Sequence, residues 1–200
     1  MTLARGDVLL RVSGLTAGYA RPVVGPLSFE VRAGEVLGLW GQNGTGKSTI
    51  LKAIGNAARV FAGRIEQAPG LTLAFLEQQP ARLPLMPVTG HELLRAAGAA
   101  RTEAPPALAA ILHRRLDRLS GGQYQLLWVW SALATAAELV LLDEPTNNLD
   151  PDAEARLVDL IVRPGNGRAV LLVSHEQRFL ESACSRIVEV SAERESGCSS

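Results

Sequence analysis

The chain has 200 residues, with 20 lysines and arginines against 20 aspartates and glutamates, so its formal net charge is zero. That balance argues against a protein built to coat nucleic acid or an anionic membrane surface, because both partners favour a basic surplus. Hydrophobic residues make up 47% of the chain and charged residues 20%, which excludes global disorder and fits one globular domain. The two cysteines, Cys184 and Cys198, give no disulfide framework and fit a reducing compartment.

The sequence contains no clear membrane-spanning segment. The best candidate, the uncharged stretch from Leu119 to Ala137, carries glycines, glutamines and serines and is interpreted as a buried part of a folded domain. The first ten residues lack the longer apolar run of a signal peptide. If the protein works at a membrane, we expect another chain to supply the lipid-facing part.

Short apolar runs of strand length recur along the chain. In chain order they are Val8–Val12, Leu27–Val31, Val36–Trp40, Leu71–Leu76, Leu139–Leu142 and Ala169–Val173. The later runs are nearly continuous and alternate with helix-like stretches, which predicts a parallel sheet covered on both faces. The first two runs are separated by turns that contain glycine and proline, so we expect them to form a small antiparallel layer.

Helix-like stretches occupy much of the remaining chain. They are Lys47–Asn56, His91–Ala100, Ala107–Leu116, Gln123–Ala136, Asp152–Val162 and Glu176–Ala183. Residues 80–118 combine five prolines with alanine-rich helical pieces, which indicates a helical insertion between two halves of the sheet. Asp150 and Pro151 are typical of a helix start, with the aspartate as its cap. The polar residues after Val190 are expected to fray.

One segment has the form of a phosphate-binding loop. Residues 41–48 match the pattern G-x-x-x-x-G-K-[ST], between an apolar strand and a helical stretch. The glycines allow the backbone N–H groups to point inward at phosphate oxygens, and the helix that opens near Lys47 adds the positive end of its dipole. Lys47 would reach the β- and γ-phosphates, and the Ser48 hydroxyl would ligate Mg²⁺. The candidate nucleotide-binding residues of this loop are Gly41, Gln42, Asn43, Gly44, Thr45, Gly46, Lys47, Ser48 and Thr49.

A second strand ends in two acids. Glu138–Leu142 is followed by Asp143 and Glu144, and ligands of open α/β sheets bind beside such strand ends. We expect Asp143 to hold Mg²⁺, through water, and Glu144 to act as the general base toward the attacking water. Taken alone, two acids at a strand end are more often a solvated terminus, so this prediction depends on the phosphate-binding loop.

A third motif places a serine and two glycines directly before a helix. Ser120, Gly121, Gly122 and Gln123 would make a second anion-binding helix start in the same chain. Because the first loop already wraps its own ligand, the second could close over the γ-phosphate held by a neighbouring copy. This arrangement predicts a head-to-tail dimer whose association depends on ATP.

The sequence Leu119–Gln123, LSGGQ, is the signature of ATP-binding cassette (ABC) ATPases, and the motif order of residues 8–190 resembles that family. The resemblance implies an α/β fold. Its parts would be a P-loop NTPase RecA-like core, an N-terminal antiparallel β layer and a short inserted α-helical subdomain at about residues 80–136. Residues 1–190 would form one ABC ATPase domain, and residues 191–200 a disordered polar tail.

The same resemblance assigns further residues. Tyr19 matches the aromatic residue that stacks on adenine, and Gln78 matches the glutamine that senses Mg²⁺ and couples to the membrane subunit, with Gln79 as the alternative register. Asn148–Asp150 match the loop that contacts the partner cassette, and His175 matches the histidine that contacts the γ-phosphate. The implied catalytic residues are Glu144, His175 and Lys47, and the implied metal ligands are Ser48, Gln78 and Asp143.

The implied function is ATP hydrolysis by a transporter subunit on the inner face of the cell membrane, in the cytoplasm, with ATP and Mg²⁺ as ligands. Its partners would be a second cassette, transmembrane permease subunits and a substrate-binding protein, with no nucleic acid. Phe75–Gln79 followed by Leu85–Thr89 resembles the cassettes of zinc and manganese importers. The alternatives are a soluble ABC protein that acts on ribosomes, since residues 146–150 resemble those proteins, and a nucleotide-dependent switch.

The helix after the signature departs from the family. The usual pattern resembles QRVALARAL, but here Leu126 and Ser131 replace the arginines, and the run also contains Trp128 and Trp130. Two residues that are two apart cannot share one helix face, so one tryptophan could face a partner or a subdomain boundary, although packing of both inside the domain is an equal alternative.

Overall fold

The computed structural model describes residues 6–78, 87–99, 102–147, 149–162 and 167–191. Its elements in chain order are β1 (Val8–Gly18), β2 (Pro22–Arg32), β3 (Val36–Trp40), α1 (Lys47–Ile54), β4 (Arg59–Gln67), β5 (Leu73–Leu76), α2 (Gly90–Ala96), α3 (Pro106–Ala109), the short 3₁₀ helix η1 (Leu116–Arg118), α4 (Gly121–Leu133), β6 (Leu139–Asp143), α5 (Pro151–Val162), β7 (Ala169–Ser174), α6 (Gln177–Ala183) and β8 (Arg186–Glu189). None of the helices within these ranges is long and apolar enough to cross a membrane.

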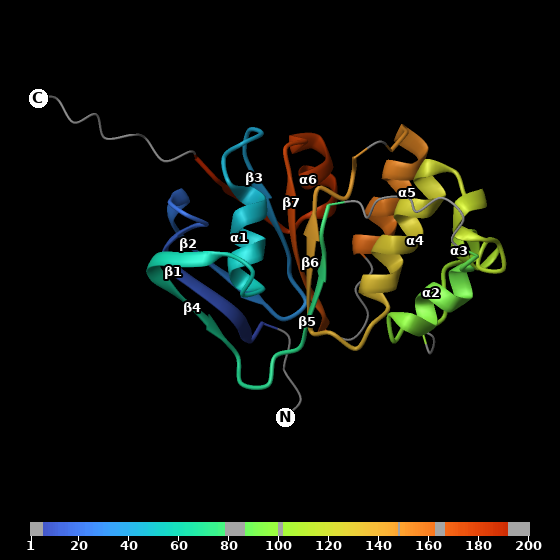
Figure 1. Ribbon diagram of the computed structural model, residues 1–200, viewed down its shortest axis with the longest axis horizontal. Coiled ribbons are helices and arrows are strands. Elements are labelled where there is room, and N and C mark those ends of the chain that lie inside the picture. Colours follow the sequence, from blue (N-terminus) through green and yellow to red (C-terminus); the bar gives the residue numbers. More distant parts are fainter. Residues whose placement is uncertain (1–5, 79–86, 100–101, 148, 163–166, 192–200) are drawn as a thin grey trace, which may run out of the picture.

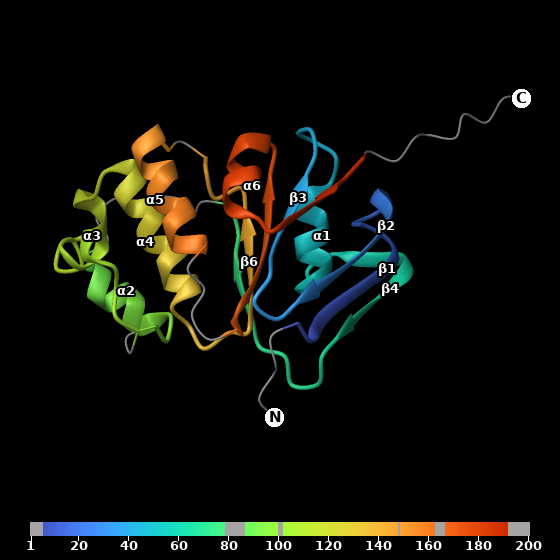
Figure 2. The same ribbon diagram turned by 180° about the vertical axis from the view of Figure 1, so that it is seen from behind.

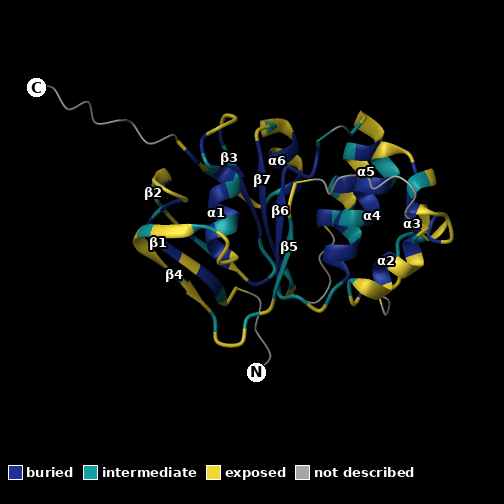
Figure 3. Ribbon diagram, in the orientation of Figure 1, coloured by how far each residue is buried: buried dark blue, intermediate teal, exposed yellow. Residues whose placement is uncertain are grey.

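Five strands form the predicted parallel sheet, in the order β5-β6-β7-β3-β8. The sheet runs through the middle of the molecule, with α1 and the antiparallel layer on one side and α4, α5 and α6 on the other (Figures 1 and 2). Alternate residues of β6 therefore enter two different hydrophobic clusters. Val140 and Leu142 join the cluster with the helices α4 to α6, whereas Leu139 and Leu141 join the cluster with α1. Burial on both faces explains why these strands are apolar without interruption (Figure 3).

The antiparallel layer has three strands, in the order β2-β1-β4. Its first two strands were predicted, but longer than their apolar runs suggested, and β4 was not. The positions of β4 are exposed or only half buried, so it carries no apolar run. A charged edge strand of this kind protects the sheet from pairing with other chains.

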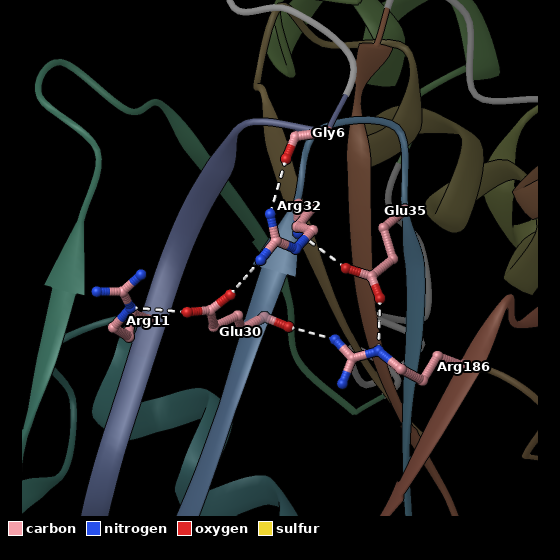
Figure 4. A network of polar contacts seen from close by, with 6 residues as sticks. All are labelled: Gly6, Arg11, Glu30, Arg32, Glu35 and Arg186. Atoms are coloured by element: carbon pink, nitrogen blue, oxygen red, sulfur yellow. Dashed lines mark hydrogen bonds and ion pairs between the residues drawn. The ribbon is translucent and has the colours of Figure 1, made fainter.

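Three arginines and two glutamates join the antiparallel layer to the edge strand β8 (Figure 4). The Glu30 carboxylate pairs with Arg11 at 2.8 Å and with Arg32 at 2.6 Å. Arg186 on β8 pairs with Glu35 at 2.8 Å and donates to the backbone oxygen of Glu30 at 2.6 Å. Each exposed pair contributes at most about 1 kcal/mol, but the shared partners fix the position of the short last strand.

The predicted helical insertion is present, and its helices are shorter than expected. Helix α2 ends at Ala96, because Gly98 adopts a left-handed φ of 73° and turns the chain. Helix α3 is a single turn that begins at Pro106. Helix α2 begins with a capping box in which the side chain of Thr89 and that of Glu92 each accept from the other's backbone N–H.

Both tryptophans of α4 pack inside the domain. Trp128 and Trp130 are partly buried against the cluster that contains α2 to α6, and the ring of Trp128 meets that of Tyr124 edge to face at 6.0 Å. Helix α4 is surrounded by protein on most of its circumference, which explains how two residues on different faces are both covered. The described chain thus favours the alternative in which both tryptophans pack inside the domain, and each keeps a partly exposed surface.

Arg168 supplies a positive charge to the end of α4. It precedes β7, and its guanidinium donates to the backbone oxygens of Leu133, Thr135 at 2.6 Å and Ala137 at 3.0 Å. The last turn of α4 has no basic residue of its own, so Arg168 satisfies carbonyls that the helix leaves open. Desolvation of the guanidinium lowers the pKa of Arg168.

Candidate nucleotide-binding site

The phosphate-binding loop lies where the sequence places it, between β3 and α1. Gly46 is the N-cap of α1, with φ 87°, and a side chain at this position would put Cβ 2.6 Å from the Cβ of Val24. Gly44 also has a left-handed φ, 84°, and a Cβ there would meet nothing within 4 Å. A glycine is therefore required at position 46 by close packing and conformation, and at position 44 by conformation.

The Lys47 side chain is buried and turns back along the loop. Its ammonium donates to the backbone oxygens of Gly41 at 2.8 Å and Gln42 at 2.9 Å, and lies 3.7 Å from a carboxylate oxygen of Glu144. The loop thus holds a buried cation at the N-terminus of α1, where the first backbone N–H groups have no partner within the helix. This combination favours a multiply charged anion.

Ser48 and Asp143 meet beside the loop, although 95 positions separate them in the sequence. The Ser48 hydroxyl donates to Oδ1 of Asp143 at 2.8 Å. Burial raises the pKa of Asp143, the Ser48 hydrogen bond lowers it and the charge of Glu144 raises it further. A hydroxyl and a carboxylate are the hard oxygen ligands that Mg²⁺ prefers, so these two residues fit the metal that the sequence implies.

Glu144 follows β6 directly and is held in a strained conformation. Its φ is 46°, in the left-handed region, and its backbone N–H donates to Val173 on β7 at 3.0 Å. Oε2 of Glu144 lies 2.9 Å from Nδ1 of His175, and Oε1 faces Lys47. Strain of this kind persists where the surrounding structure imposes it, which is common at functional sites.

A cavity of about 410 Å³ collects most of these residues. It is lined by Val23, Asn43, Gly44, Gly46, Lys47, Ser48, Thr49, Gln78, Glu144, Asn147 and His175. Of the lining residues, Val23 and Asn147 were not among the predicted site residues. Asn147 lies in the segment after the strand-end acids, a signal that could have included it, whereas Val23 is brought in only by the packing of β2 against the loop.

Gly41, Gln42, Thr45 and Asp143 belong to the loop and the strand end beside this cavity but are not among its lining residues. Tyr19 and the signature residues lie outside it. Tyr19 follows β1 and is half exposed, at 52%, which leaves its ring available to a flat ligand. The signature residues lie on α4, on the opposite side of the parallel sheet from α1 (Figure 1). Ser120 is the N-cap of α4 and forms a capping box with Gln123, and a Cβ on Gly122 would be 3.0 Å from that of Ala153.

Within one chain the structure therefore does not bring the signature and the phosphate-binding loop together.

Helix α5 begins at Pro151, as predicted, and Oδ1 of Asp150 accepts from the backbone N–H of Ala153 at 2.8 Å. Gln79, Asn148, Cys198 and the tail 192–200 lie outside the described residues.

Comparison with known proteins identifies the family of this chain. The family model described as "ABC transporter" matches residues 24–147. The zinc import ATP-binding protein ZnuC of Roseobacter denitrificans is 36% identical over 189 residues, which cover 90% of this chain and 74% of that protein. The lipoprotein-releasing system ATP-binding protein LolD of Anaeromyxobacter dehalogenans is 36% identical over 216 residues, with 90% of each chain covered.

Solved structures agree with the fold. A structure of an ATP-binding subunit of an ABC transporter superposes with a TM-score of 0.74 and is 27% identical, with 92% of this chain and 86% of that chain covered. A metal-chelate type ABC transporter in an inward-facing conformation superposes with a TM-score of 0.78 at 23% identity, covering 92% of this chain and 80% of that chain. The predicted P-loop α/β fold is confirmed. The chain belongs to the ABC transporter family as an ATP-binding subunit that hydrolyses ATP.

Proposed function

We propose that the cavity between the phosphate-binding loop and Glu144 binds the triphosphate of ATP together with Mg²⁺. The observation that carries this proposal is the convergence of Lys47, Ser48 and Glu144 on one cavity from the ends of β3 and β6, with Asp143 held beside it by Ser48. Lys47 and the loop N–H groups bind phosphate oxygens, and the Lys47 ammonium exchanges its contacts with the loop carbonyls for them. Ser48, Asp143 and Gln78 hold Mg²⁺, which when bound neutralises charge on the β- and γ-phosphates. Tyr19 covers the adenine.

Glu144 is the general base in this proposal. One of its oxygens is oriented by His175 and the other faces Lys47, so its carboxylate has little freedom to turn away from the cavity. A carboxylate placed beside a phosphate site can accept the proton of an attacking water. His175, which is more exposed than Glu144, contacts the γ-phosphate side.

Two copies of the chain would pair head to tail, so that Ser120, Gly121, Gly122 and Gln123 of one copy close the cavity of the other. The support is the separation described above, because α4 and the loop face different sides of the sheet in one chain. Binding of ATP would favour the closed pair and hydrolysis would release it. This cycle would drive transmembrane permease subunits, at the inner face of the membrane.

The cargo we propose is a metal ion, delivered by a substrate-binding protein. Zinc import ATP-binding proteins from several bacteria are 30–36% identical to this chain over most of its length. The lipoprotein-releasing relative is equally identical, so the test must measure metal uptake and lipoprotein release side by side. A cell that lacks this chain should grow poorly only at limiting zinc or manganese. Loss of lipoprotein release with normal metal uptake would assign the other cargo.

The biochemical test is Glu144→Gln, which removes the base and keeps the shape of the side chain. We expect the turnover number to fall by roughly 10²- to 10⁴-fold, the usual contribution of a general base. ATP binding should persist, so the variant should accumulate dimers in Mg-ATP that light scattering detects. Unchanged turnover would refute the role of Glu144, and monomers throughout would refute the proposed dimer.

A further inference from the structure

Gln125 is a buried polar residue in the middle of α4. It is 2% exposed, and its neighbours Tyr124, Leu126 and Leu127 are buried as well. Its side-chain Nε2 donates to the backbone oxygen of Pro145 at 3.0 Å, across the contact between α4 and the loop after β6. The reversed orientation of the amide would set two acceptors against each other, so this assignment of its nitrogen follows from the geometry.

The hydrogen bond from Gln125 stabilises the fold at an offsetting cost. Among the described residues, no donor pairs with Oε1 of Gln125, which is fully buried. The desolvation of that oxygen costs about as much as one neutral hydrogen bond contributes. An apolar side chain of similar length would avoid that cost but would leave the buried carbonyl oxygen of Pro145 without this donor.

The bond ends on the residue next to the base. Pro145 directly follows Glu144, whose left-handed φ and bond to Val173 already fix its other side. The hydroxyl of Thr146, the next residue, is also buried and has no partner among the described residues. A buried polar oxygen on each side of this contact therefore has no hydrogen-bond partner among the described residues. This is expected of a contact that is retained because it positions the loop.

We propose that Gln125 is a positioning residue that ties the signature helix to Glu144. Gln125 lies five residues after Ser120 on a rigid helix, about 7.5 Å along its axis. When the start of α4 engages the nucleotide of the partner copy, the bond carries its displacement to Pro145 and sets the Glu144 carboxylate. The inference rests on the proposed function, in which Glu144 is the base and α4 serves the other copy.

The test is Gln125→Met, which keeps the length of the side chain and removes the donor. We expect the turnover number to fall about tenfold, because small displacements of a catalytic group are costly. The dissociation constant for Mg-ATP should stay at the wild-type value, and the melting temperature should fall by only about 2–8 °C, because the buried Pro145 carbonyl loses its donor. In the Glu144→Gln background the same substitution should have no further effect, because Gln125 acts through Glu144.

A matched control is Thr102→Val. It removes a side-chain bond of 2.8 Å to the Ala134 carbonyl at the far end of α4, so it loosens the same helix without touching the loop after Glu144. Its turnover number should stay within twofold of wild type. Should Gln125→Met fail to fold, Gln125→Leu provides the same comparison, and hydrogen exchange in peptides with Glu144 and Asn147 should rise while the end of α4 keeps its protection.

Three results would overturn the inference: wild-type turnover in Gln125→Met, a melting temperature so low that the variant is partly unfolded at the assay temperature, or an equal loss of turnover in both backgrounds. The outcome is separable from failure of the proposed function. If the wild-type protein and Glu144→Gln hydrolyse ATP equally, the proposed function fails. If they differ as expected and Gln125→Met matches wild type, only the present inference fails.

Discussion

Arg168 should contribute more to stability than any surface ion pair of this protein. Its guanidinium satisfies three carbonyls at and after the end of α4, and it joins that end to the start of β7. Arg168→Met keeps much of the apolar stem and removes all three bonds. The variant therefore leaves the C-terminal end of the signature helix without its cation.

The size of the effect follows from the three bonds. Hydrogen bonds to a charged group contribute about 1.5–3 kcal/mol each, which as a simple sum gives about 4.5–9 kcal/mol. Thr135 and Ala137 are only partly buried, so their carbonyls regain water in the variant, and the partly buried guanidinium no longer has to be desolvated. We therefore expect a loss of about 2–4 kcal/mol in the free energy of unfolding. For a chain of this size, that loss lowers the melting temperature by roughly 4–16 °C.

Thermal unfolding followed by circular dichroism measures this loss, with Arg178→Met as the control. Arg178 is exposed on α6, so its removal changes the net charge equally and should shift the melting temperature by less than about 2 °C. Arg168→Lys should fall between the two, because an ammonium keeps the charge and loses the planar fork. Equal melting temperatures for Arg168→Met and Arg178→Met would refute the role assigned to Arg168.

Two further predictions concern buried ionisable groups. Burial raises the pKa of Asp143, so the folded protein binds its proton more readily than the unfolded chain, and stability falls as the pH rises from the unfolded value through the folded pKa. Asp143→Asn should therefore stabilise the metal-free protein at pH 8 by about 1 kcal/mol, and this gain should vanish near pH 3, while ATP hydrolysis is lost. Urea unfolding at both pH values in the presence of a chelator measures the change. A variant less stable than wild type at pH 8 would contradict the prediction. Burial also raises the pKa of the Cys184 thiol to about 12. In a Cys198→Ser background at pH 8, alkylation should be about a thousandfold slower than for an exposed thiol, and labelling at the rate of free cysteine would contradict this burial.

Features set by local patterns were predictable from the sequence. Strand β3 and the start of α1 follow from an apolar run and a spaced glycine motif, and the cap of α5 follows from Asp150 and Pro151. Strand β4 was not predicted because an exposed strand has no apolar run, and β8 was not predicted because it is short and charged. In both cases, the extended conformation depends on pairing with a strand that is distant in the sequence.

The candidate site also contains residues that local motifs predict and contacts that they do not. Lys47, Ser48, Asp143 and Glu144 belong to motifs; the structure brings Lys47, Ser48 and Glu144 into one cavity and joins Asp143 to Ser48 beside it. The bonds of Gln125 to Pro145 and of Arg168 to the end of α4 join a side chain to backbone carbonyls far along the chain. A helix cap involves a backbone group a few residues away, whereas no residue pattern encodes a backbone partner that is distant in the sequence, so these contacts could be found only in three dimensions.

The central claim is that each ATP is bound by the loop of one copy and the signature of another. Mixing two inactive variants, Lys47→Ala and Ser120→Arg, tests it directly. In a mixed dimer one cavity combines both defects and the other combines the intact loop with the intact signature. Equal amounts should therefore recover up to about a quarter of wild-type hydrolysis, since about half of the pairs are mixed and each has one complete site. A mixture as inactive as its two components would contradict the account.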